Sequence, residues 1–144
     1  MASGSDAYDL ERFLLAQAGV YERACAELRA GEKQSHWMWF IFPQIRGLGS
    51  SKMATRYAIS SLDEARAYLH HPVLGPRLRE SARIVTGVKD KTAGEIFGPP
   101  DDLKFHSSMT LFARVAQSGE DHVFRNALEQ YFGGKEDAGT IQRI

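Results

Sequence analysis

Apolar residues recur every three or four positions along most of this chain, and that spacing constrains the fold more than any other feature. Within residues 9–29 the apolar set is Leu10, Phe13, Leu14, Val20, Tyr21, Ala24 and Leu28. Such steps place side chains on one face of an α-helix, whereas a β-strand needs strict alternation. No alternating pattern persists beyond a few residues. The sequence therefore predicts an all-α, mainly helical protein.

Capping and helix-breaking residues divide the chain into short segments. Ser61, with Glu64 three residues later, is a capping-box pattern, and Pro72 would end the helix that follows. Gly98-Pro99-Pro100 is a firm break before a longer helix. The predicted helices span residues 9–29, 36–40, 52–59, 61–71, 73–88, 102–116 and 121–132, and Thr92 is predicted to cap a short turn that ends at Phe97. We therefore expect a compact single domain of six to eight short helices.

The length of the chain, 144 residues, suits one domain with a sizeable core. Residues 9–134 are predicted to form this domain, residues 1–8 to be disordered or vector-derived, and residues 135–144 to be a flexible polar tail. We find neither a signal-peptide pattern nor an apolar run of bilayer length. The single cysteine, Cys25, excludes an intramolecular disulfide. These features predict a cytoplasmic protein without a membrane partner.

Charge is balanced over the whole chain but not locally. The chain has 18 Lys and Arg and 18 Asp and Glu, a formal net charge of zero, which argues against long duplex nucleic acid as a partner. Residues 33–62, however, contain no Asp or Glu. This acid-free segment holds Lys33, Arg46, Lys52, Arg56 and both tryptophans. Cations, aromatic rings and glycines together indicate a binding site for a small anionic ligand.

The aromatic part of the acid-free segment has two interpretations. Four rings within six residues cannot all face one core at helical spacing, so some would line a cleft or cover a partner. The candidate ligand contacts are Trp37, Trp39, Phe42 and Tyr57, because aromatic faces stack on nucleobases. The alternative is plain core packing. His36 is either a proton donor, with a suitable intrinsic pKa, or a structural histidine.

A glycine-rich turn follows the aromatic residues. Gly47 and Gly49 allow close backbone approach, and the helix expected after Ser51 would offer free N–H groups to an anion. The candidate phosphate-binding residues are Lys33, Arg46, Gly49, Ser50, Ser51 and Lys52. The turn is not a Walker motif, since its spacing differs. The alternative is a capped helix with a solvated basic face.

A third group of polar residues lies near residues 101–110. Asp102 and His106 are four residues apart and can meet on one helical face, where Asp102 would act as a general base or a ribose-hydroxyl acceptor. The alternative for Asp102 is a favourable position at a helix N-terminus. Ser107 and Ser108 interrupt an otherwise apolar helix, so they predict a polar cleft or a close helix contact. No metal-ligand motif is present, and we expect no cofactor.

The segments described above resemble the uncharacterised bacterial family of domain of unknown function 1810. The resemblance covers nearly all of residues 9–134. Its strongest carriers are residues 35–44, Gly47-Leu48-Gly49-Ser50, His71-Pro72-Val73-Leu74-Gly75, Asp101-Asp102-Leu103-Lys104 and Ser107-Ser108-Met109-Thr110. Membership of this family implies a small, mostly helical single domain.

In size and order of elements the chain is also similar, more distantly, to YbiA-like (NADAR) domains. That likeness implies an ADP-ribose derivative as ligand and cleavage of an N-glycosidic bond, although no glutamate in residues 33–62 matches their catalytic one.

Two functional hypotheses follow. In the first, the chain binds, and as an enzyme would hydrolyse, a phosphate-bearing nucleotide-like ligand such as an ADP-ribose derivative. Asp102, His36 and Lys104 would then be catalytic, and His106, Ser107 and Ser108 would join the ligand contacts. In the second, the chain is a non-catalytic sensing or protein-interaction module that uses its Trp/Phe-rich segment. A homo-oligomer remains open under either hypothesis.

Overall fold

Helices make up the fold, as the apolar spacing predicts. The computed structural model describes residues 6–116 and 119–144. Within these ranges the elements are α2 (Glu11–Gln17), α3 (Tyr21–Arg29), α4 (Met38–Ile41), α5 (Lys52–Arg56), α6 (Leu62–His70), α7 (Leu74–Thr86), α8 (Ala93–Phe97), α9 (Asp101–Val115), the 3-10 helix η1 (Gly119–Asp121), α10 (His122–Phe132) and α11 (Ala138–Ile141). The all-α class is confirmed, but the described residues form ten α-helices rather than six to eight. None of these helices is long and apolar enough to cross a bilayer.

The segment predicted as one helix over residues 9–29 is two helices. The break falls at Gly19, whose φ of +74° is a left-handed conformation that glycine adopts at little cost. The start of the first helix also differs from the prediction. The N-cap position of α2 is Leu10, not Asp9, and the Asp6 carboxylate precedes it, accepting hydrogen bonds from Leu10 N at 2.5 Å and Glu11 N at 3.3 Å. Part of the N-terminal segment predicted to be disordered therefore has a structural role, while residues 1–5 lie outside the described residues.

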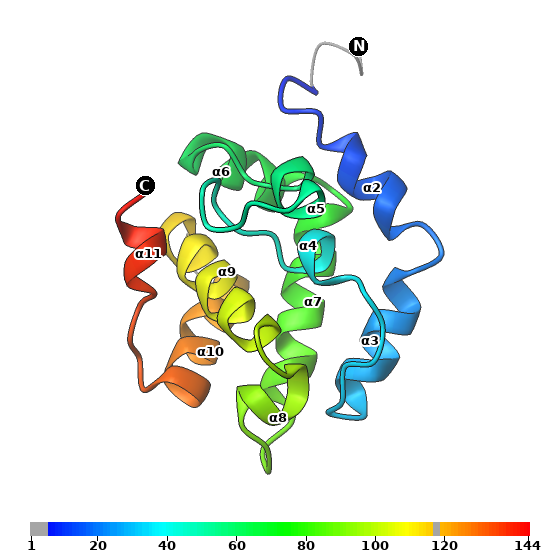
Figure 1. The fold of residues 1–144 in the computed structure, drawn as a ribbon, viewed down its shortest axis with the longest axis vertical. Helices are drawn as coiled ribbons and strands as arrows, with labels where there is room; N and C mark the ends of the chain where they lie inside the picture. Colours follow the sequence, from blue (N-terminus) through cyan, green and yellow to red (C-terminus); the bar gives the residue numbers. More distant parts are fainter. Residues whose placement is uncertain (1–5, 117–118) are drawn as a thin grey trace.

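The two longest helices, α7 and α9, organise the core (Figure 1). Helix α7 contacts α3, α6 and α10, and α9 contacts α6, α8, α10 and α11. Phe13 meets Tyr68 edge-to-face with ring centroids 5.0 Å apart, Tyr68 lies 5.5 Å from Phe112, and Phe112 lies 5.9 Å from Phe124. This row of buried rings joins α2, α6, α9 and α10 through the centre of the molecule.

A single β-bridge shapes the loop that carries α5. Ile45 and Ile59 pair in parallel, outside any strand. Arg46 N donates to Ile59 O, and Ile59 N donates to Gln44 O, both at 2.8 Å. The bridge closes the loop at its base, so Arg46 is held beside the segment that follows α5.

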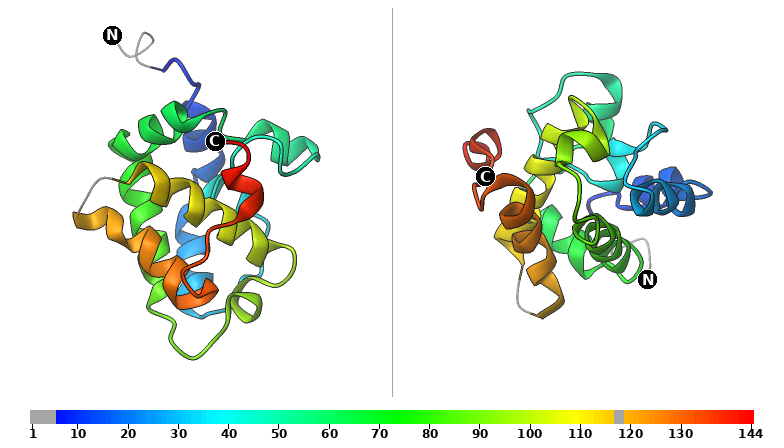
Figure 2. Two further views of the ribbon diagram at one scale, coloured as in Figure 1. Left: turned by 90° about the vertical axis from the view of Figure 1, so that its left-hand side faces the viewer. Right: turned by 90° about the horizontal axis from the view of Figure 1, so that it is seen from below.

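The C-terminal residues pack on the domain, in contrast to the flexible tail predicted for residues 135–144. Helix α11 packs against α9 (Figure 2). Thr140, in this helix, is fully buried. Asp137 caps α11 by accepting from Thr140 N at 2.9 Å and Thr140 Oγ1 at 2.7 Å. Glu136 pairs with Arg114 at 2.6 Å. This segment is held by a polar cap and an ion pair. The spacing of apolar residues in the sequence does not predict such contacts.

Candidate functional site

The Trp/Phe-rich segment packs mainly into the core. Trp37 and Phe42 have no exposed surface, and Tyr57 is 8% exposed. The Trp37 indole N–H donates to Glu27 at 2.9 Å, and Phe42 meets Phe105 edge-to-face at 5.1 Å. Rings buried in this way have no free face for a nucleobase. Of the two interpretations that the sequence leaves open, core packing describes these three side chains.

Glu27, just outside the acid-free segment, holds the start of that segment in place. Its carboxylate accepts hydrogen bonds from Gln34 N at 2.8 Å, Ser35 N at 3.0 Å, Ser35 Oγ and Trp37 Nε1. Burial raises the pKa of Glu27, but the hydrogen bonds from Ser35, Gln34 and Trp37 outweigh it and lower the pKa to about 2. Ser35 is therefore bonded to α3 and does not cap the helix after it.

Three predicted site residues meet near the start of α9. Lys33 Nζ lies 2.8 Å from Asp101 Oδ2, and Lys104 Nζ lies 3.5 Å from Asp101 Oδ1. Lys104 also lies over the Trp39 ring, 5.0 Å from its centroid, and Trp39 is half-buried. Asp101, which is not among the predicted site residues, neutralises much of the positive charge of both lysines.

The residues predicted to transfer protons do not come together. Asp102 accepts a hydrogen bond from the next backbone N–H at 2.9 Å in the first turn of α9. His36 is exposed. His106 stacks on Phe132 with centroids 4.0 Å apart, and its Nε2 lies 2.8 Å from Lys135 O. Within the described ranges no hydrogen bond or ion pair links Asp102 to either histidine, and no group of three or more acidic, His or Cys side chains could hold a metal ion.

The hydroxyl groups of Ser107 and Ser108 in α9 have different surroundings. Ser107 Oγ donates to Lys104 O at 3.0 Å and accepts from Gln44 Nε2 at 2.6 Å. Ser108 is fully buried, and its Oγ has no hydrogen-bond partner in the described part of the chain. Of the two expectations for these serines, a close contact describes Ser107.

The glycine-rich turn serves the start of α5. Ser51 Oγ accepts from Ala54 N at 3.1 Å, and a Cβ at Gly49 would lie 2.7 Å from the Ala54 Cβ. Close packing therefore requires glycine at position 49. Ser50 and Lys52 are exposed, and Lys52 makes no ion pair with a described residue. Helix α5 has only five residues, so its N-terminus is a weak anion site.

A polar hollow of 430 Å³ lies between the start of α2, α5 and the start of α6. Its lining residues are Ala7, Tyr8, Asp9, Arg12, Arg46, Thr55, Arg56, Ala58, Ser60 and Glu64. We call it the arginine hollow. No residue of α9 belongs to this lining, so the hollow is separate from Asp102 and Lys104.

Arg12 is fully engaged within the protein. Its Nε donates to Arg56 O at 2.9 Å, its Nη1 to Tyr8 O at 2.6 Å and Asp9 O at 2.8 Å, and its Nη2 to Ala58 O at 2.9 Å. Nη2 also pairs with the buried Glu64 at 2.8 Å. A guanidinium with these partners has little capacity for a ligand. Arg12 is therefore a structural part of the hollow.

Three other charged groups of the hollow have no oppositely charged partner among the described residues, although the Arg56 guanidinium lies over the Tyr57 ring, 5.6 Å from its centroid. Arg46 is exposed, and its side chain has no hydrogen bond or ion pair with a described residue. Arg56 Nε donates weakly to Tyr57 O–H oxygen at 3.3 Å and has no acidic partner in the described ranges. The Asp9 carboxylate is exposed and likewise without a described partner. All three residues line the hollow, and none of their charges is neutralised by a described residue.

The sequence indicated part of this site. Arg46 is a predicted ligand contact, and Arg56 lies four residues after Lys52, a spacing that places two cations on one helical face. Tyr8, Asp9 and Thr55 were not expected. No spacing in the sequence connects residue 9 with residue 46, because the Ile45–Ile59 bridge and Arg12 bring them to one hollow.

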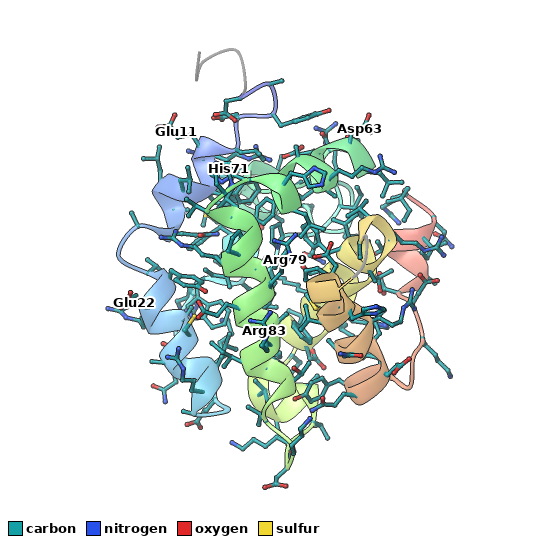
Figure 3. The ribbon with its side chains drawn as sticks, turned by 180° about the vertical axis from the view of Figure 1, so that it is seen from behind. Glu11, Glu22, Asp63, His71, Arg79 and Arg83 are labelled. Atoms are coloured by element: carbon teal, nitrogen blue, oxygen red, sulfur yellow. The ribbon has the colours of Figure 1, made fainter. Side chains whose placement is uncertain are left out.

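A second hollow, of 320 Å³, is formed by residues of α7. Figure 3 labels Arg79 and Arg83 on this helix. It is lined by Pro76, Arg77, Arg79, Glu80 and Arg83. Arg79 Nε donates to Asp121 at 2.6 Å, and Arg77 donates to Gln17 at 3.1 Å. Since one helix forms this lining and two of its three arginines are engaged, the arginine hollow is the stronger candidate.

Comparison with known proteins places the fold in a family without a described activity. The sequence model of the family described as "Protein of unknown function (DUF1810)" matches residues 7–144. The crystal structure of the conserved hypothetical protein Rv1873 from Mycobacterium tuberculosis is 56% identical in sequence, with a TM-score of 0.90, over 94% of this chain and 95% of that one. No curated protein matches the chain. The chain therefore belongs to the DUF1810 family.

Proposed function

We propose that the arginine hollow binds a phosphate-bearing small molecule. The observation that carries this proposal is that Arg46 and Arg56 line one concavity while neither has an acidic partner among the described residues. A guanidinium binds phosphate through two parallel N–H···O hydrogen bonds. The hydroxyl of Thr55, exposed in the same lining, adds a further donor. Such donors suit the several oxygens of a phosphate group.

Size and lining support a nucleotide-like ligand, such as an ADP-ribose derivative. The 430 Å³ volume falls within the range of about 300–1,000 Å³ that is common for small-molecule sites. Tyr8 supplies the aromatic side chain of the lining, in place of the buried Trp37 and Phe42. The proposal is of binding without hydrolysis, because Asp102 and Lys104 lie outside the hollow.

The alternative hypothesis, a protein-interaction module, has less support. It needs the Trp/Phe-rich segment at the surface, but Trp39 is the only ring of that segment's residues 37–42 that is more than slightly exposed. One half-exposed tryptophan beneath Lys104 is a small patch for a protein partner.

Isothermal titration with AMP, ADP-ribose and inorganic phosphate tests the proposal. We expect Arg46→Ala and Arg56→Ala each to weaken binding of AMP by about 10-fold or more, since each removes charge-assisted hydrogen bonds. Arg83→Ala on α7 is the matched control, because Arg83 is exposed and has no ion pair with a described residue. The proposal fails if the wild type binds none of the three compounds, or if Arg46→Ala and Arg56→Ala bind AMP as the control does.

A further inference from the structure

The carboxylate of Asp9, which has no partner among the described residues, distinguishes the arginine hollow from a simple phosphate site. Asp9 lines the same hollow as Arg46 and Arg56, yet no ion pair joins it to either guanidinium. Its backbone carbonyl accepts a hydrogen bond from Arg12 at 2.8 Å, which fixes the position of residue 9, while its carboxylate has no hydrogen bond or ion pair with a described side chain. The hollow thus has two kinds of binding group, separated by more than ion-pair distance.

A carboxylate accepts hydrogen bonds through two oxygens, and it donates none when ionised. Its ligand counterpart is therefore either a cation or neutral N–H or O–H donors, and in a phosphate-bearing nucleotide-like ligand the donors nearest the phosphate are the hydroxyl groups of the sugar. A cationic group would lie in the same hollow as two guanidiniums that lack an acidic partner among the described residues, and like charges repel. Neutral hydroxyl donors do not have this cost. Two neighbouring hydroxyls match the two carboxylate oxygens in number and spacing.

We infer that the ligand of the arginine hollow is a phosphorylated sugar with vicinal hydroxyl groups. Arg46 and Arg56 bind its phosphate, and Asp9 accepts hydrogen bonds from its diol. This inference rests on the proposed function, since it assigns the phosphate to the same two arginines. It adds Asp9 as a residue that determines specificity by binding the sugar and not the phosphate.

The backbone conformation at residue 9 allows the Asp9 side chain to be replaced without backbone strain. Asp9 has a φ of 54°, in the left-handed region that glycine and asparagine adopt more readily than other residues. Asp9→Gly therefore removes both acceptors without opposing the backbone. Asp9→Asn keeps one acceptor and removes the charge. Thermal unfolding of both variants checks that the fold is retained.

The test compares two probes that differ by one hydroxyl, ribose 5-phosphate and 2-deoxyribose 5-phosphate, with inorganic phosphate as a third. We expect the wild type to bind ribose 5-phosphate about 10-fold more tightly than the deoxy sugar, as for a lost hydrogen bond to a charged group. Asp9→Gly should bind both sugars equally, and Asp9→Asn should be intermediate. Binding of inorganic phosphate should change less than about 2-fold in either variant. Asp63→Asn, an exposed acid on α6 outside the hollow, is the control and should bind as the wild type does (Figure 3).

The outcomes separate the two proposals. If the wild type binds phosphate and both sugars with equal affinity, the sugar assignment is wrong and the phosphate site stands. If Asp9→Gly weakens binding of both sugars by the same factor relative to the wild type, Asp9 does not bind the diol. If neither phosphate nor either sugar binds, both proposals fail.

Discussion

Glu27 shows how one side chain can fix a whole segment. Its four hydrogen-bond donors come from residues 34–37, and they hold the start of the acid-free segment against α3. One of the donors is the indole of Trp37, so the same carboxylate satisfies the polar atom of the largest buried ring. The ring can be buried because its N–H has this partner.

Stability should depend on the ionisation of Glu27 at acid pH. The pKa is about 2 in the folded protein, against an ordinary value of 4.5, so the carboxylate stabilises the fold above pH 4.5 and loses this effect as the pH falls toward 2. Glu27→Gln cannot ionise. We therefore expect the wild type to exceed this variant in free energy of unfolding by the largest margin above pH 4.5. Urea denaturation of both proteins from pH 6 to pH 2.5 measures the margin, and a constant margin would contradict the argument.

Among the elements, the short helix α11 supports the glycine-rich turn. It covers α9 and also touches the glycine-rich turn: a Cβ at Gly139 would lie 3.1 Å from Leu48, and one at Gly47 would lie 2.8 Å from Arg143. The C-terminal helix thus supports the loop that runs on from Arg46 to α5.

Removal of the cap of α11 should loosen that loop. Asp137→Ala deletes the acceptor of Thr140 N and Oγ1, and loss of such a cap costs about 1 kcal/mol. We expect faster hydrogen exchange of the amides in α11 and in residues 46–50. Thr92→Ala, which removes the cap of α8, is the comparison and should leave residues 46–50 unchanged. Unchanged exchange in Asp137→Ala would show that α11 does not support the loop.

In the molecule as a whole, Arg12 joins parts of the chain that are distant in sequence. It bonds the start of α2 to residues 56 and 58 and to Glu64 on α6. The arginine hollow exists because these segments are held together there.

Arg12→Lys should destabilise the protein by about 2–3 kcal/mol. An ammonium group has three donors and no planar fork, so it cannot replace the five hydrogen bonds that Arg12 makes to described residues. Arg66→Lys tests an exposed ion pair with Asp63 and should cost less than about 0.5 kcal/mol. Chemical denaturation gives both values. Equal costs for the two variants would exclude Arg12 as a central link.

The sequence predicts the fold better than it predicts the site, for physical reasons. Helical spacing and caps such as Ser61 and Thr92 are local, and both caps are present in the structure. The burial of Trp37 depends on Glu27, and the convergence of Asp9 with Arg46 depends on a bridge between residues 45 and 59. These contacts join residues that are distant in sequence or are polar, so the local spacing of apolar residues does not predict them. The packing of α11 was not predicted for the same reason.

The location of the two tryptophans limits what fluorescence can report. Trp37 is buried against Glu27, Trp39 lies beneath Lys104, and neither lines the arginine hollow. Indole emission would therefore follow the loss of the core during unfolding, while a ligand in the hollow would leave it nearly constant. The aromatic side chain at the hollow is a tyrosine, Tyr8, whose emission is weak beside that of two tryptophans. A fluorescence titration without a signal would thus be the normal behaviour of an occupied site, and calorimetry is the method that can detect the ligand.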